Sequence, residues 1–171
     1  MLKIKLIITI DENGVMGSKN KLPWSLKDDL VQFKKETMGS PLIMGSNTFK
    51  SLPGILPGRE HIVLSSTMDG NANMSVFTSI KQAIDYIDES YKTCYVIGGA
   101  NIVKQFADLN MFDELIISHV NCSIKGDTVL DLDALNLDEW EIHKRIKYNK
   151  SDKNDYDFTV CHYIPVKKRF F

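Results

Sequence analysis

The chain has 171 residues, of which 43% are apolar and 25% are charged, and its 21 Lys and Arg nearly balance its 22 Asp and Glu. These values are ordinary for one folded domain, and they exclude a disordered or fibrous protein. A net charge of −1 offers no basic surface for nucleic acid or anionic lipid. We therefore expect a small-molecule ligand, no nucleic-acid partner and no membrane association.

The N-terminal segment and the cysteines indicate the compartment. The run Leu6 to Ile10 is far shorter than the roughly 20 residues that span a bilayer, and no cleavable signal peptide precedes Asp11-Glu12. Cys94, Cys122 and Cys161 are odd in number and widely spaced in apolar contexts, which favours free structural thiols over disulfides or a zinc site. A cytoplasmic protein is expected.

Hydrophobic periodicity predicts strands that alternate with helices. In chain order the predicted elements are a strand over 2–10, a long loop over 12–24, a helix over 26–38, a strand over 42–44, a helix over 46–51, a strand over 61–64, a helix over 80–87 capped by Ser79, a strand over 95–97, a helix over 101–109, a strand over 114–120, and an antiparallel pair over 141–148 and 157–164. This order predicts an α/β fold whose sheet is parallel in part and mixed at its edge, in one domain over 1–165 with a basic tail over 166–171.

Two local signals flank the start of the first predicted helix. The loop over 12–24 is long for a compact domain, which favours a moving element over a binding site. Ser25 is predicted to cap the helix, with Asp28 three residues later completing a capping box.

Asp29 stands on the apolar side of this helix, three residues after Leu26 and four before Phe33, while Asp28 points about 100° away toward solvent. An ionised carboxylate among apolar neighbours is costly unless it is paired, so this position suits a ligand or proton-transfer role. A second interpretation stays open, because acids in a first turn also interact favourably with the helix dipole.

Two glycine turns each follow an apolar strand and open a helix. They begin at Gly45 and at Gly98-Gly99. Each turn aims free backbone amides at an anion, although one alone is often only a structural cap. Two of them at neighbouring strand ends would suit a dinucleotide.

Several motifs together carry a family resemblance. They are Ile7-Ile8-Thr9, Asp11 to Gly17, Leu22-Pro23-Trp24, Asp29-Leu30, Phe33-Lys34, Pro41 to Gly45, Thr48-Phe49, Leu56 to Arg59, Val96 to Gly99, and Gly126-Asp127-Thr128. In this order and spacing the chain resembles the dihydrofolate reductases along nearly its whole length. The resemblance implies one mixed eight-stranded sheet flanked by about four helices, and a single cleft where cofactor and pterin meet.

The resemblance also implies a site and a reaction. NADPH would reduce 7,8-dihydrofolate to 5,6,7,8-tetrahydrofolate for one-carbon metabolism and thymidylate synthesis. Asp29 would grip the pterin and favour its protonated form, with water as the proton donor, and Arg59 would bind the glutamate tail. The implied catalytic residues are Asp29, Trp24 and Leu22, and the implied substrate-binding residues are Ile7, Ile8, Asp29, Leu30, Phe33, Leu52, Leu56, Arg59, Ile97 and Ser118.

The implied cofactor is NADPH, and no metal is expected. Its implied binding residues are Thr9, Met16, Gly17, Gly45, Asn47, Thr48, Leu64, Ser65, Ser66, Ile97, Gly98, Gly99, Ala100, Asn101, Ile102 and Val103. Ser46 and Asn101 replace arginines that in many bacterial members pair with the 2′-phosphate, and Val103 replaces an aromatic often found beside the nicotinamide. Diaminopyrimidine antifolates are the expected inhibitors, and a monomer is the expected state.

Two other functions fit part of the sequence. The reductase of the riboflavin pathway shares the fold, but Asp29 and Arg59 in their motifs disfavour it. A non-catalytic folate-binding or nucleotide-binding module is also possible on this fold. The acid, the long loop and both glycine turns together favour an enzyme.

Overall fold

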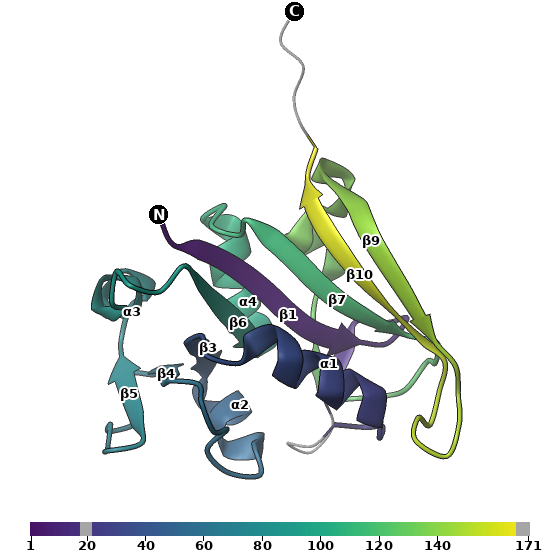
Figure 1. Cartoon of the computed structure of the whole chain (residues 1–171), viewed down its shortest axis with the longest axis horizontal. Coiled ribbons are helices and arrows are strands. Elements are labelled where there is room, and N and C mark those ends of the chain that lie inside the picture. The colour runs from purple at the N-terminus through teal and green to yellow at the C-terminus, as the bar shows by residue number, and fades with distance from the viewer. Residues whose placement is uncertain (18–21, 167–171) are drawn as a thin grey trace, which may run out of the picture.

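The computed structural model describes residues 1–17 and 22–166, which form one eight-stranded sheet with helices on both faces (Figure 1). The strands of the sheet are β1 (Lys3–Ile10), β3 (Leu42–Gly45), β4 (His61–Leu64), β5 (Met74–Phe77), β6 (Thr93–Gly98), β7 (Glu114–Val120), β9 (Trp140–Tyr148) and β10 (Phe158–Pro165). The helices are α1 (Lys27–Thr37), α2 (Ser46–Ser51), α3 (Ile80–Tyr86) and α4 (Ala100–Asp108), with 3₁₀ turns at Leu132–Leu135 and Leu137–Glu139.

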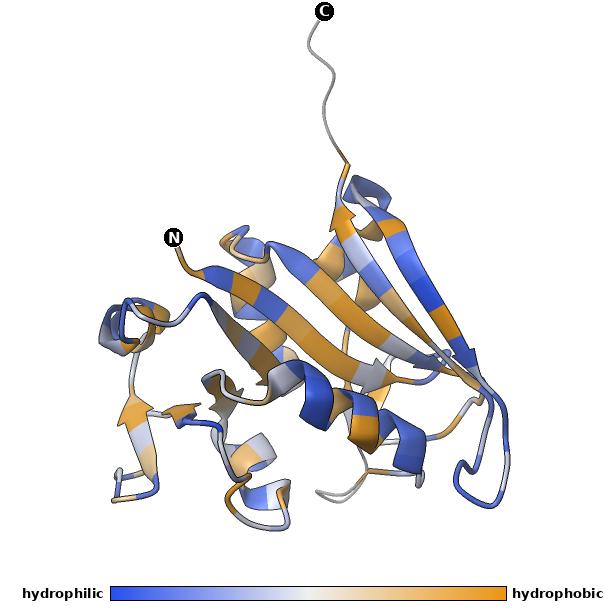
Figure 2. Ribbon diagram, viewed as in Figure 1, coloured by the Kyte–Doolittle hydropathy of each residue, from blue (hydrophilic) through white to orange (hydrophobic). Residues whose placement is uncertain are grey.

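The strand order is β5-β4-β3-β6-β1-β7-β10-β9. Pairings from β5 through β7 are parallel, whereas β10 runs antiparallel to both β7 and β9. The predicted α/β fold with a mixed edge is confirmed. Figure 2 shows the consequence for composition, because the central strands are mostly hydrophobic while the edge strand β9 is mostly hydrophilic and exposed.

Alternate residues of β1 face two separate cores. Ile4, Leu6 and Ile8 pack against α3 and α4 on one side. Ile7 belongs to the core on the other side, which α1 crosses (Figure 1). The second face is only partly covered, and its open part holds the polar groups described below.

The start of α1 differs from the prediction. The residue before the helix is Leu26, not Ser25, and no side chain of its own caps it. Instead the buried Asn154, which is 126 residues away, accepts a hydrogen bond from the Asp28 amide and donates one to the Asp28 carboxylate. The Ser25 capping box and the solvent-facing Asp28 are therefore wrong, because a distant loop supplies the cap.

The long loop contains a short strand. β2 (Val15–Gly17) pairs with β8 (Thr128–Val129) in a separate two-stranded sheet. The buried Asp11 carboxylate accepts hydrogen bonds from the amides of Asn13, Val15 and Ile124, which ties the two segments together. Residues 18–21 of the loop lie outside the described residues, as do residues 167–171 of the predicted tail.

Among the residues that the structure describes, no helix has the length and hydropathy needed to cross a membrane. All three cysteines are free thiols, as predicted. Cys94 and Cys161 are buried and Cys122 is partly buried.

Candidate active site

A cleft of about 820 Å³ lies between α1, α2 and the carboxyl ends of β1, β3 and β6. It brings together most of the predicted site residues, namely Ile7, Ile8, Thr9, Met16, Leu22, Asp29, Leu30, Phe33, Gly45, Asn47, Thr48, Leu52, Leu56, Arg59, Leu64, Ile97, Gly99, Ala100, Asn101 and Ile102. Leu22 and Leu30 are more than half exposed, so both present apolar surface to a ligand.

Asp29 forms part of the cleft wall while remaining 7% exposed. Its Oδ2 accepts a 2.5 Å hydrogen bond from the Thr9 hydroxyl, and its Oδ1 accepts hydrogen bonds from the Ser118 hydroxyl at 2.6 Å and the Gln32 amide at 3.0 Å. All three donors are neutral, and no ion pair joins Asp29 to a cation within 1–17 and 22–166. Three neutral donors thus fix the orientation of the Asp29 carboxylate.

Arg59 lies at the α1 side of the same cleft and is 8% exposed. Its Nε donates to the Pro57 carbonyl at 3.1 Å and its Nη1 to the Thr37 hydroxyl at 3.3 Å. Within the described residues no carboxylate forms an ion pair with it. Burial lowers the pKa of Arg59 below its ordinary value. A guanidinium still charged at neutral pH and facing a cleft suits an anionic ligand.

His61 positions the Arg59 segment, a role that the sequence did not suggest. Its Nε2 accepts from the Leu56 amide at 3.1 Å, so the proton sits on Nδ1, which donates to the Arg59 carbonyl at 2.9 Å. The ring is fully buried, and desolvation lowers the pKa of His61. The neutral imidazole therefore clamps the loop that carries two cleft residues.

The two glycine turns lie side by side, because β3 and β6 are neighbours and Met44 pairs with Gly98. A Cβ on Gly45 would come within 3.1 Å of Ile102 and 3.8 Å of the Gly99 nitrogen. Gly98 has φ of 128°, a conformation that only glycine adopts readily. Neither α2 nor α4 has a side-chain cap, so their first amides are left for an anion. These turns fit the pyrophosphate of a dinucleotide.

Some predicted residues do not reach the cleft. Trp24 and Val103 are buried in the core, and the Val103 amide bonds to Gly99. The Ser65 hydroxyl accepts hydrogen bonds from the backbone amides of Thr67 and Met68, and Ser66 is exposed. Ser118 and Gly98 also do not line the cleft, although Ser118 acts on it through Asp29.

Other cleft residues were not predicted. They are Gln32, Lys34, Ser51, Pro53, Asp127, Thr128 and Val129. Ser46, which was expected near the 2′-phosphate of the cofactor, also lines the cleft. Gln32 could have been found, because a residue three positions after Asp29 shares its side of the helix. The β8 residues face the cleft only because β8 pairs with β2, a contact between segments more than 100 residues apart.

Comparison with known proteins decides the family. The dihydrofolate reductase family profile matches residues 3–165. The chain belongs to the dihydrofolate reductase family. It is 32% identical over 169 residues to the dihydrofolate reductase of Haemophilus influenzae, covering 98% of this chain and 100% of that protein. It is 34% identical over 163 residues to the dihydrofolate reductase of Bacillus subtilis, covering 94% and 93% of the two chains.

A solved structure agrees with this family assignment. A dihydrofolate reductase from Enterococcus faecalis, solved in complex with NADP(H) and RAB-propyl, superposes with a TM-score of 0.85 at 28% identity, covering 96% of this chain and 97% of that chain. The chain therefore catalyses the NADPH-dependent reduction of dihydrofolate to tetrahydrofolate, and like its family it binds dihydrofolate and antifolate inhibitors.

Proposed function

We propose that Asp29 anchors the pterin of dihydrofolate and favours its protonated form. The observation that carries this proposal is a buried cleft carboxylate whose hydrogen-bond donors, among the described residues, are all neutral. Two parallel donors, such as the amino group and ring nitrogen of a pterin, match the two oxygens of a carboxylate. One would use the free lone pair of Oδ2, and the other would take the place of the half-buried Gln32 amide on Oδ1.

Protonation precedes reduction in this proposal. In this scheme water, and not Asp29, donates the proton to the ring nitrogen. The fixed negative charge then stabilises the positive charge on the ring, which is strongest in a cleft that excludes solvent. Thr9 and Ser118 hold the carboxylate in place. When bound, NADPH supplies the hydride to the adjacent carbon.

Arg59 would bind the carboxylate of the glutamate tail. Its planar fork matches a carboxylate, and its own hydrogen bonds to Pro57 and Thr37 orient it. The apolar walls around the pterin and benzoyl rings would be formed by Ile7, Ile8, Leu22, Leu30, Phe33, Leu52, Leu56 and Ile97.

The cofactor would lie along the two glycine turns. Its phosphates would be held by Gly45, Asn47 and Thr48 of one turn and by Gly99, Ala100 and Asn101 of the other. Leu64 and Ile102 would lie beside them. Thr9 and Ile97 would contact the nicotinamide, and Met16 would cover it. Because Ser46 and Asn101 carry no charge, we expect a smaller preference for NADPH over NADH than two arginines would give.

The proposal extends to inhibitors, assembly and location. A protonated diaminopyrimidine offers the same paired donors as the pterin, so we expect such antifolates to compete for Asp29. We also propose a monomer without nucleic-acid or membrane partners. A cytoplasmic location is supported by the three free thiols, since a reducing compartment keeps cysteines unpaired.

The test follows the absorbance of reduced nicotinamide with purified protein, dihydrofolate and either NADPH or NADH. Turnover with NADPH, lost in Asp29→Asn without a matching loss of NADPH affinity, is the expected result. Full turnover in Asp29→Asn would refute the assigned role.

A further inference from the structure

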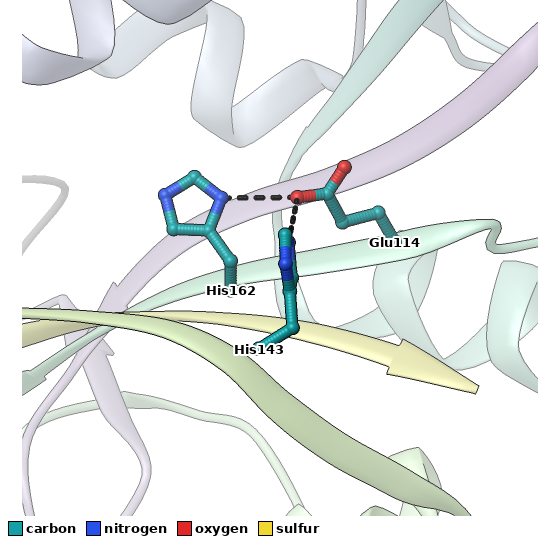
Figure 3. Close-up of side chains that lie close together, drawn as sticks. All are labelled: Glu114, His143 and His162. Atoms are coloured by element: carbon teal, nitrogen blue, oxygen red, sulfur yellow. Dashed lines mark hydrogen bonds and ion pairs between the residues drawn. The ribbon is translucent and has the colours of Figure 1, made fainter. Parts of the chain in front are cut away.

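A second polar cluster lies on three neighbouring strands and outside the active-site cleft. Glu114 opens β7, His162 lies on β10 and His143 lies on β9, and none of the three lines the cleft. In Figure 3 both imidazoles approach the same carboxylate oxygen. His162 Nδ1 is 3.0 Å and His143 Nε2 is 3.9 Å from Glu114 Oε1. The three ligand atoms all lie within 4.8 Å of one another.

An irregularity of β9 brings His143 into this cluster. His162 pairs with Lys144 and the next residue, Tyr163, pairs with Ile142, so His143 is the extra residue of a β-bulge. In a regular strand His143 and Lys144 would face opposite sides of the sheet. A bulge re-aims a side chain, and here it turns His143 toward His162, with the two rings edge to face and their centroids 6.2 Å apart.

Lys5 orients the carboxylate without occupying the shared oxygen. Its Nζ lies 2.8 Å from Glu114 Oε2, which leaves Oε1 to the histidines. A carboxylate ligand whose second oxygen is held by a neighbour is the usual arrangement around a bound metal. Lys5 and His162 thus contact different oxygens of Glu114, which fixes the orientation of this carboxylate.

We propose that Glu114, His143 and His162 form a binding site for Zn²⁺, with water as the fourth ligand. Two imidazoles and one carboxylate are a donor set typical of zinc, whereas Mg²⁺ and Ca²⁺ prefer oxygen ligands alone. Zinc–ligand bonds of about 2.0–2.2 Å place tetrahedral ligand atoms about 3.3 Å apart. The side chain of His143 is 47% exposed, so it has the freedom to close the remaining gap. Zinc displaces the proton shared between His162 and Glu114.

A zinc ion at this site would link β7, β10 and β9, the three strands at the antiparallel side of the sheet. An ion that binds only the folded chain raises its melting temperature with the logarithm of ion concentration. Zinc binding here would be independent of the proposed catalytic roles, because none of the three residues lines the cleft.

The experiment titrates the full chain with ZnCl₂ and records imidazole resonances, zinc stoichiometry by equilibrium dialysis, and melting temperature. The sequence has four histidines, so His61 and His119 are internal controls. We expect one Zn²⁺ per chain, shifts confined to His143 and His162, and an affinity at least about tenfold weaker in His143→Ala. Glu141→Gln, an exposed acid on the same strand, and Cys122→Ser should bind zinc like the original chain.

Three results would overturn the site. They are no movement of the two imidazoles at millimolar zinc, equal affinity in His143→Ala, or loss of binding in Cys122→Ser. Because about half of the His143 side chain is exposed, its replacement should preserve folding, and an unchanged melting temperature without zinc verifies this.

Discussion

Asp29 and Glu114 show two ways of keeping a carboxylate on the same face of the sheet. Thr9 and Ser118 bond to Asp29, whereas Lys5, four residues before Thr9 on β1, bonds to Glu114, four residues before Ser118 on β7. Four residues of a strand span about 13 Å. Among the described residues, Asp29 accepts hydrogen bonds from neutral donors only, whereas Glu114 forms an ion pair with Lys5. Within residues 1–17 and 22–166, Asp29 pairs with no cation, so it is the carboxylate that a cationic ligand can bind.

Asp29→Asn should produce the largest effect. Losing the negative charge removes the stabilisation of the protonated pterin, so turnover near pH 7 should fall by at least about 100-fold. NADPH affinity should stay near its original value, because the turns at Gly45 and Gly99 are untouched. Steady-state kinetics and a fluorescence titration with NADPH measure the two quantities.

The matched control is Asp28→Asn. Asp28 stands beside Asp29 in the first turn of α1 but bonds to Asn154 outside the cleft. Its replacement should leave turnover unchanged, and an equal loss in both variants would mean that the helix dipole, not the ligand, explains Asp29.

Arg59→Lys should have the next effect, a 10- to 100-fold loss in kcat/KM for dihydrofolate. The estimate follows from about 1.5–3 kcal/mol for a hydrogen bond to a charged group, and a lysine cannot form the paired bonds. A dihydropterin without the glutamate tail should be reduced equally well by both proteins. A similar loss with that shorter substrate would contradict the assignment.

Glu114→Gln should affect stability and leave turnover alone. Measured without zinc, the free energy of unfolding should fall by about 1–2 kcal/mol, because the pairs with His162 and Lys5 are lost. The native pKa of about 2 lies below the ordinary value of 4.5, so the unfolded chain binds the proton first as pH falls. The difference between the two proteins should therefore be full above about pH 4.5 and shrink toward pH 2. Urea denaturation at several pH values measures it, and a pH-independent difference would contradict the pairing.

Ser118→Ala should have the smallest effect. It removes one of the neutral donors to Asp29. A hydrogen bond of this kind contributes about 1 kcal/mol, so kcat/KM should fall about three- to tenfold. Steady-state kinetics measure this, with Ser123→Ala as an exposed control. No change in Ser118→Ala would show that Thr9 suffices to hold the carboxylate once substrate has replaced Gln32.

Local patterns predicted what depends on neighbours in the chain. Helical spacing identified Asp29 as an acid on the apolar side, and the two strand–glycine–helix segments predicted neighbouring turns that the structure confirms. The strand at 74–77 was missed, because it has only four residues and Ser75 interrupts its apolar run. The roles of individual cleft residues remain predictions.

Contacts between distant segments could not be predicted in this way. The cap of α1 comes from Asn154, the His61 clamp depends on a loop conformation, and β2 finds β8 across the chain. The cluster of Glu114, His143 and His162 depends on strand order and a bulge, and neither leaves a local sequence signal.

The most direct test of the central claim compares Asp29→Asn with Glu114→Gln in the same two measurements, turnover near pH 7 and free energy of unfolding in zinc-free buffer. Each variant replaces one carboxylate with an amide of the same shape. We predict opposite outcomes, with Asp29→Asn losing turnover but not stability and Glu114→Gln losing stability but not turnover. Comparable turnover loss in both variants, or none in Asp29→Asn, would contradict the claim that Asp29, which pairs with no cation among the described residues, is the carboxylate that binds the substrate.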